Sequence, residues 1–289
     1  MFQYNKAAEL LSICISSKMA LAEVIIQAEM EESGLSRDDI WQMMSERFDI
    51  MKNSIINGVE KELKSKGGLI GGNARKLYLN LNSALSGKTA TKAVSYALAV
   101  TEVNASMGKI VASPTAGSSG ILPGVLLALA EDYDYPREKL IEALFVAAGL
   151  GRIIAINATL SGAEGGCQAE CGSASAMAAA TATYLVGGSP EQCFNAAAMA
   201  LKGLLGLVCD PVAGLVEVPC SKRNATSTAN ALICADMTIA GIQSFIPFDE
   251  VVEAMHRVGQ LMSPDLRETA RGGCAAVPTA LKYEKTIKK

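Results

Sequence analysis

The chain has 289 residues, of which 50% are hydrophobic, 5% are aromatic and 19% are charged, and its formal net charge is −3. This composition excludes a disordered chain, which would combine low hydrophobicity with high net charge, and it offers no basic stripe of the kind that binds nucleic acids. Because aromatic residues are so few, the core of a globular fold must be built from Ala, Leu, Ile, Val and Met.

Helical periodicity of apolar residues begins near the N-terminus. Residues 4–33 predict a helix that ends at Ser33-Gly34, and Ser36 predicts the N-cap of a second helix that reaches about Leu63. The glycine-rich stretch 67–72 then interrupts the pattern.

That stretch is the expected boundary between two parts of the chain. Residues 1–66 are predicted to form an N-terminal helical arm, and residues 67–289 a helical core. The two parts are expected to make one integrated domain.

The core is predicted to be helical almost throughout. Helices are expected near 88–106, 121–131, 137–150, 172–187, 190–206, 224–243 and 249–262. Ser189, Pro190 and Gln192 together form a helix start signal. Only segments 109–113 and 215–219 alternate with a period of two and resemble strands. The sequence therefore predicts an all-α fold, a compact multi-helix domain with Gly/Pro-rich loops that carry cysteines.

A membrane protein is the main alternative for so hydrophobic a chain. The uncharged stretch between Glu170 and Glu191 is long enough to span a bilayer. It consists mostly of Ala, Ser, Thr and Gly, which pack helices closely but partition weakly into lipid. The first residues, MFQYNKAAELL, lack the features of a signal peptide. We therefore expect a cytoplasmic protein without a membrane span.

The eight cysteines fall into two groups. In a reducing cytosol they are not expected to form disulfides. Cys14, Cys193 and Cys234 lie in apolar helical patterns and are expected to be buried, unreactive side chains. The other five stand beside Gly, Pro or charged residues, where helices break: Cys167, Cys171, Cys209, Cys220 and Cys274.

Three turns in the charge-poor segment 153–221 and just beyond it carry four of these five cysteines. The turns are 162–175, 207–214 and 216–225. So little charge predicts a central position in the fold. A buried loop leaves backbone groups without partners unless something binds there, and a ligand or cofactor would supply those partners.

The spacing of Cys167, Cys209 and Cys220 leaves two interpretations open. It does not match the paired cysteines of a zinc site, and His256 is the only histidine. Three thiolates on separate loops suit an iron–sulfur cluster with one iron open to substrate, where it acts as a Lewis acid. Buried thiols in tight turns are the other interpretation.

The segment SPTAGSSG, residues 113–120, stands directly before an apolar helix. Backbone N–H groups and hydroxyls at a helix N-terminus can bind a carboxylate or phosphate, although a plain capped turn has the same pattern. It matches no nucleotide-binding motif. Lys222 and Arg223, just after Cys220, either attract an anionic cluster and substrate or form a solvated helix start.

The chain resembles the alpha subunit, or alpha domain, of bacterial iron–sulfur-dependent L-serine dehydratase (L-serine ammonia-lyase). The resemblance covers nearly the whole chain and is carried by SYALAVTEVNASMGKIVASPTAGSSGILPG, GAEGGCQAECGSASAMAAA and LVCDPVAGLVEVPCSKRNA, and more weakly by LAEVIIQAEMEESG and RETARGGCAAVPTA. It implies a lyase that converts L-serine to pyruvate and ammonia without PLP.

The resemblance also implies the site residues. Cys167, Cys209 and Cys220 would ligate a [4Fe–4S] cluster in the core. The substrate carboxylate would be held by Ser113, Thr115, Gly117, Ser118 and Ser119, together with Lys222 or Arg223. The sequence identifies no catalytic base, since His256 is expected on a helix face, and the base would then reside on the partner chain.

The sequence departs from the family pattern in two ways. The family's beta part carries a Ser-rich motif with a histidine, SSSH, that is absent here, so we expect a separate beta subunit as partner. Some relatives place a cysteine at the extreme C-terminus as a displaceable cluster ligand, whereas the last cysteine here is Cys274. Either Cys274 or Cys171 could contact the fourth iron, but the motif assigns neither.

Three other functions are compatible with the sequence. A related iron–sulfur lyase, such as an L-cysteine desulfidase, would release a different product. A non-catalytic iron–sulfur redox protein would bind the cluster without turnover. An all-α packing protein with incidental thiols would bind no iron.

Overall fold

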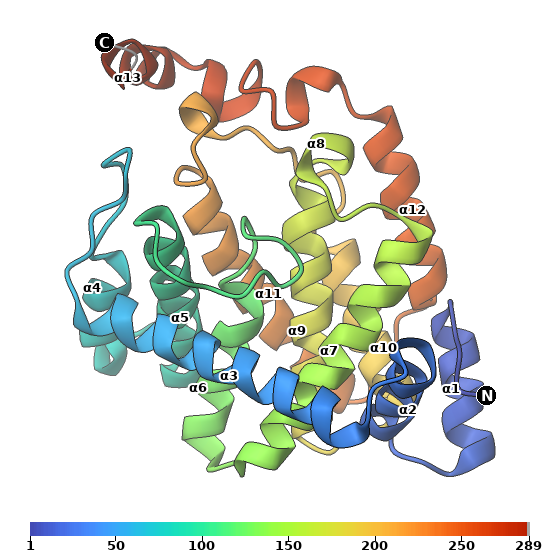
Figure 1. Cartoon of the computed structure of the whole chain (residues 1–289). Helices are drawn as coiled ribbons and strands as arrows, with labels where there is room; N and C mark the ends of the chain where they lie inside the picture. Colours follow the sequence, from blue (N-terminus) through green and yellow to red (C-terminus); the bar gives the residue numbers. More distant parts are fainter. Residues whose placement is uncertain (288–289) are drawn as a thin grey trace.

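The structure is a computed structural model that describes residues 1–287, and the elements of this part of the chain are helical, as predicted (Figure 1). The α-helices are α1 (Ala7–Ser17), α2 (Leu21–Ser33), α3 (Arg37–Glu60), α4 (Asn73–Leu79), α5 (Lys88–Ala105), α6 (Ile121–Tyr133), α7 (Arg137–Asn157), α8 (Gly162–Gly165), α9 (Ser173–Leu185), α10 (Pro190–Lys202), α11 (Cys220–Ile239), α12 (Phe248–Leu261) and α13 (Pro278–Ile287). Short 3₁₀ or π-helical turns are η1 (Leu81–Ser83), η2 (Gln168–Gly172), η3 (Val212–Gly214), η4 (Pro264–Leu266) and η5 (Gly273–Ala276).

The two segments expected to resemble strands do not form strands. Residues 109–113 are loop, and residues 215–219 form turns closed by local bonds, such as that from Glu217 N to Leu215 O (2.7 Å). The prediction was wrong because alternation in one short segment has no neighbouring strand with which to pair. Among residues 1–287, the pairing outside helices is one isolated parallel bridge between Cys209 and Arg267.

The N-terminal prediction of one helix over 4–33 was also wrong in detail. The chain leaves the helical conformation at Lys18, which has a φ of 56°, so two helices, α1 and α2, replace the one expected. Ser36 does cap α3: its Oγ accepts a hydrogen bond from the Asp39 N–H (3.2 Å). The predicted start at Ser189 is confirmed in the same way, by a bond from Gln192 N to Ser189 Oγ (3.2 Å).

The remaining predicted helices are confirmed as α5, α6, α7, α9, α10, α11 and α12, with shifted ends. The sequence missed α4, α8 and α13. The N-terminus of α4 is capped by a distant side chain, because Glu102 Oε1 accepts from Asn73 N (2.7 Å), and a local sequence pattern carries no trace of such a cap. The division of the chain into an arm, residues 1–66, and a core, residues 67–289, stays a prediction. Residues 288 and 289 of the predicted core lie outside the described residues.

Helix α9 lies at the centre of the bundle, and each of its residues is buried. It packs against α7, α10, α11 and α6. The charge-poor segment is therefore central, as the sequence predicts, since small side chains let these helices approach closely. Buried residues of α1, α2 and α3 join the same hydrophobic core as those of α5 to α12.

One helix, α7, is long and apolar enough to cross a membrane. In the fold, 67% of its most apolar stretch is buried against neighbouring helices. Because most of this stretch is buried, the apolar composition of α7 is that of a helix in the protein core.

Glycine allows α5 and α6 to approach closely. A Cβ on Gly124 would lie 2.7 Å from Ala93 O and 3.2 Å from Ala97 Cβ. We therefore expect Gly124→Ala to lower the free energy of unfolding by about 1–3 kcal/mol, because the helices must separate. Denaturant unfolding measures the change. In an exposed helix the same substitution stabilises, so an increase in stability would refute this packing argument.

Candidate functional site

The three predicted cysteine turns meet at one end of the bundle. Cys167 precedes η2, a π-helical turn that leads into α9; Cys209 lies in the loop after α10; and Cys220 is the first residue of α11. Such π-helical turns are frequent at functional sites. The two cis peptide bonds of residues 1–287, Ser113–Pro114 and Val218–Pro219, also lie in the loops at this site.

The Gln168 side chain connects the turn that carries Cys167 to α12 and to the segment before Cys209. Its side chain is fully buried. The amide Nε2 donates to Gly165 O and Met255 O (both 3.0 Å), and Oε1 accepts from Gly206 N (2.9 Å). The turn after α8 is thereby fixed to α12 and to the start of the Cys209 loop.

An ion pair holds the Cys209 loop against α11. Asp210 is 1% exposed and pairs through Oδ1 with Arg223 Nη1 (2.6 Å). Arg223 also donates to Val208 O (2.6 Å). The second oxygen of Asp210, Oδ2, accepts from Cys274 N (2.5 Å). One buried carboxylate therefore connects the Cys209 loop, α11 and the C-terminal segment.

That C-terminal segment runs from α12 across the end of the bundle that carries α8 (Figure 1). It pairs with both main-chain groups of Cys209, because Cys209 N donates to Leu266 O and Glu268 N donates to Cys209 O (both 2.8 Å). A second buried carboxylate, Glu217, accepts from Ser65 Oγ (2.7 Å) and so fixes the other end of the loop to the 65–69 turn. The position of Cys209 is thus set by main-chain bonds.

The thiols at this site are mostly buried. Cys167, Cys171 and Cys209 are each less than 5% exposed, and Cys220 is half-buried. The Sγ atoms of Cys167 and Cys171 lie 3.3 Å apart. No residue within the described part of the chain belongs to a group of three or more His, Cys, Asp or Glu side chains placed to hold a single metal ion.

The thiols are close enough to influence one another. The hydrogen bond with Cys171 lowers the pKa of Cys167, and the Arg223 charge acts in the same direction. Burial raises the pKa of Cys209, and that of Cys220 to about 12, with Cys167 adding to both shifts. Cys167, Cys209 and Cys220 therefore form one electrostatic group, the thiol triad, next to a guanidinium.

The loop 113–120 lies beside the thiol triad. Asn224 of α11 joins them: Nδ2 donates to Gly117 O (2.7 Å) and Cys220 O (3.0 Å), while Oδ1 accepts from Gly120 N (3.0 Å). Ser113, Ser118 and Ser119 are buried, whereas Thr115 and Gly117 are partly exposed. The predicted substrate loop and the predicted cluster ligands thus come together in space.

Three consecutive N–H groups in this loop are uncommitted. Those of Ala116, Gly117 and Ser118 donate no hydrogen bond to another group within residues 1–287. They lie in the turn that leads into α6, whose N-terminus favours negative charge. Successive free N–H groups of this kind can bind a carboxylate.

Glu170 is the residue at this site that sequence reasoning missed. Its Oε1 accepts from Thr115 Oγ1 (2.6 Å), and its Oε2 lies 4.0 Å from Cys209 Sγ. A Cβ on Gly117 or Gly162 would lie 2.8 Å or 2.6 Å from the carboxylate. Burial raises the pKa of Glu170, with a smaller contribution from Glu268. The signal that could have identified Glu170 is its position as an isolated acidic residue in the charge-poor segment 153–221.

The other candidate residues take different positions. Lys222 is exposed, and Arg223 is engaged by Asp210. Cys274 is also exposed and contacts the site through its backbone. His256 lies on a face of α12 beside Gln260, as expected.

The three cysteines predicted to be unreactive core residues are confirmed as buried. They are Cys14 in α1, Cys193 in α10 and Cys234 in α11.

Comparison with known proteins identifies a family. Residues 16–275 match the family model described as the serine dehydratase alpha chain. The chain is 49% identical to a probable L-serine dehydratase, alpha chain, of Bacillus subtilis, over 98% of this chain and 95% of that one. It is 42% identical to the L-serine dehydratase, alpha chain, of Peptoniphilus asaccharolyticus, over 99% and 98%.

A longer relative matches over only part of its own length. The L-serine dehydratase TdcG of Escherichia coli is 37% identical over 95% of this chain but only 62% of that protein. The full-length alpha chain relatives and the matching family model agree with the resemblance predicted from the sequence. The chain belongs to the serine dehydratase alpha chain family.

Proposed function

We propose that this chain is the alpha subunit of a two-chain enzyme that converts L-serine to pyruvate and ammonia, with a [4Fe–4S] cluster held by Cys167, Cys209 and Cys220. The observation that carries the proposal is the meeting of the thiol triad with the loop 113–120, joined by Asn224 and Glu170. Relatives across nearly the full chain are named for this reaction.

The chemistry of the donor set fits such a cluster. Each of the three thiols comes from a different segment: the turn before η2, the loop after α10 and the start of α11. Ligands that bind different irons of one cluster stand further apart than ligands of a single ion, in keeping with the lack of a single-ion site among residues 1–287. Arg223 supplies positive charge beside sulfur ligands that must be deprotonated to bind iron.

When bound, a cluster with one iron free of protein ligands supplies a Lewis acid for the departure of the serine hydroxyl. The protein's own residues hold the substrate. The free N–H groups of Ala116, Gly117 and Ser118 bind the carboxylate, aided by the N-terminus of α6. Thr115 presents its hydroxyl at the same edge of the site.

Glu170 is the acidic group that we assign to the substrate ammonium. Its carboxylate already accepts from Thr115 and lies near Cys209, between the two parts of the site. An acceptor at this point orients the Cα–H bond of serine, because the carboxylate and ammonium are then fixed on different loops. No residue of this chain is assigned as the base that removes the α-proton.

The two-chain arrangement is supported by the lengths of relatives. The chain matches 95% and 98% of two proteins named alpha chain, but only 62% of the longer Escherichia coli enzyme. A separate beta chain would supply the part of the longer protein that has no counterpart here.

The first test concerns the cluster. We expect Cys209→Ser, after anaerobic reconstitution with iron and sulfide, to lose the visible absorption of the cluster and pyruvate formation together. Cys234→Ser is the matched control, because Cys234 is also a buried thiol but lies within α11, outside the triad. Full pyruvate formation by Cys209→Ser without iron would rule out the proposed role of the triad.

The second test concerns the substrate loop. Thr115→Val keeps the shape of the side chain but removes the hydroxyl that donates a hydrogen bond to Glu170. We expect kcat/KM for L-serine to fall about tenfold or more, because a hydrogen bond to a charged group is lost, while the visible spectrum is retained. The control is Thr226→Val, whose hydroxyl bonds only to backbone oxygens of α11. An unchanged kcat/KM in Thr115→Val would exclude the contact between Thr115 and Glu170 from substrate binding.

The third test concerns the partner. We expect the reconstituted chain alone to form little pyruvate from L-serine, and addition of a beta chain from the same source to restore turnover, because the SSSH motif is absent here. Product analysis with L-cysteine in the same assay separates the dehydratase from a desulfidase. Equal rates with and without the beta chain would contradict the two-chain proposal.

A further inference from the structure

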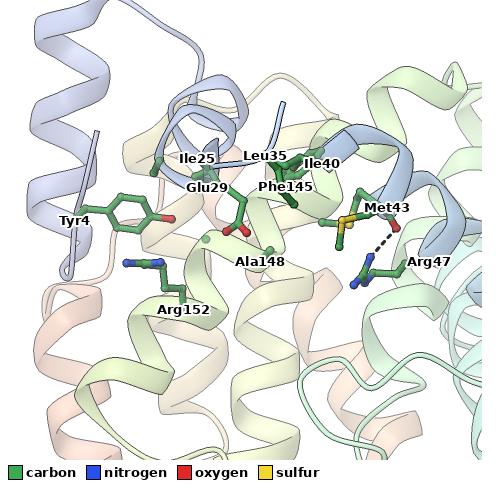
Figure 2. Close-up of a pocket in the computed structure, with 13 residues that line it drawn as sticks. Tyr4, Ile25, Glu29, Leu35, Ile40, Met43, Arg47, Phe145, Ala148 and Arg152 are labelled. Carbon is green, nitrogen blue, oxygen red and sulfur yellow. Dashed lines mark hydrogen bonds between the residues drawn. The ribbon is translucent and has the colours of Figure 1, made fainter. Parts of the chain in front are cut away.

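A cavity of about 280 Å³ lies between the segment before α1 and the helices α2, α3 and α7 (Figure 2). None of its lining residues belongs to the site described above. The lining is apolar on one side and carries four polar groups, those of Tyr4, Glu29, Arg47 and Arg152.

The α7 wall shows that the cavity is built into the fold. Phe145, Ala148, Gly149 and Arg152 recur at helical spacing on one face of α7. Ala148 is exposed although its neighbours on either side are buried, because it faces the cavity. A Cβ on Gly149 would lie 3.0 Å from the Tyr4 hydroxyl oxygen. That Cβ would also clash with the Ile25 side chain, so Gly149 lets α2 and Tyr4 approach α7 closely, whereas Ala148 fills little of the space that it faces.

Tyr4 is a buried residue whose hydroxyl has no hydrogen-bond partner in the described chain. The residue is only 3% exposed, and its hydroxyl forms no hydrogen bond with another group of residues 1–287. Figure 2 shows it directed toward the space above Ala148, where the Glu29 carboxylate also lies. Burial raises the pKa of Tyr4, so the hydroxyl stays neutral and can donate.

The charged groups of the cavity also have bonding capacity left. Arg152 pairs with Glu32 through Nη1, donates through Nη2 to Gln3 Oε1 (3.4 Å) and lies over the Tyr4 ring, but its buried Nε has no partner within the described chain. Arg47 donates to Met43 O of its own helix (2.7 Å) and pairs with no acid there. The Glu29 carboxylate is likewise without an ion pair among these residues. A ligand with both an acidic and a basic group would complete these interactions.

The apolar wall indicates what the rest of the ligand is. Leu35 and Met43 are 40% and 42% exposed at the cavity, and Ile40, Met44 and Phe145 extend the same wall. Exposed apolar side chains beside a few fixed polar groups are typical of a binding pocket for a small amphipathic molecule.

We propose that this cavity binds a free aliphatic α-amino acid at a site separate from the catalytic one. The carboxylate is bound by Arg152 with the Tyr4 hydroxyl, the ammonium by Glu29, and the aliphatic side chain packs on Leu35 and Met43. The inference rests on this cavity alone and does not depend on the cluster or on turnover.

Isothermal titration of the full chain with L-leucine tests the proposal. We expect saturable binding of one molecule per chain. Isocaproate, which lacks the amine, and isoamylamine, which lacks the carboxylate, should each bind at least about tenfold more weakly, because each loses a charge-assisted hydrogen bond. Absence of saturable leucine binding, or equally tight binding of isocaproate, would overturn the proposal.

Variants assign the binding to this cavity. Ala148→Leu fills the space and should abolish binding, whereas Ala155→Leu, at another exposed alanine of α7, should retain it. Glu29→Gln, at an exposed position, should weaken binding about tenfold even if Ala148→Leu fails to fold. Thr115→Val should leave leucine binding unchanged. Binding that survives in a folded Ala148→Leu, or that is lost in Thr115→Val, would place the ligand elsewhere and refute the assignment.

Discussion

The site depends on the ion pair between Asp210 and Arg223. A buried carboxylate is costly unless it is paired and hydrogen-bonded, and Asp210 meets both conditions through Arg223 and the N–H of Cys274. The same contacts fix the Cys209 loop to the start of α11, where Cys220 lies, and to the C-terminal segment. The charge of Arg223 also stabilises the thiolate form of Cys167 and Cys220. One ion pair thus sets both the geometry and the electrostatics of the thiol triad.

The rest of the fold brings the N-termini of α6, α9 and α11 together at the thiol triad. Loop 113–120 leads into α6, η2 leads into α9, and Cys220 begins α11. Contacts through Asn224 and Glu170 show that these three helix starts are neighbours. The N-terminal end of a helix carries partial positive charge, so a substrate carboxylate and sulfur ligands would both be favoured there. The fully buried, small-residue helix α9 lets its neighbours pack closely enough for the loops to meet.

The sequence predicted those features that local chemistry determines. Ser36 and Ser189 cap helices with their own neighbours, so both starts could be recognised, and the cysteine turns were visible as breaks in helical periodicity. The start of α4 could not be predicted, since its cap is the distant Glu102. Glu170 was missed for the same reason: its role arises only when its turn meets Thr115. Arg223 was recognised as positive charge beside Cys220, but its pairing with Asp210 depends on how a separate loop folds back.

The extent of the family match agrees with the extent of the site. The match ends at residue 275, one residue beyond Cys274, whose N–H is the last backbone group to reach Asp210. The segment between α12 and this point adds no regular helix longer than one turn, yet it bonds to both the N–H and the C=O of Cys209. Its contribution is therefore positional: it fixes the main chain on either side of one thiol. Helix α13 follows and packs on η3, at the end of the Cys209 turn, and on η5, so it supports both segments from outside.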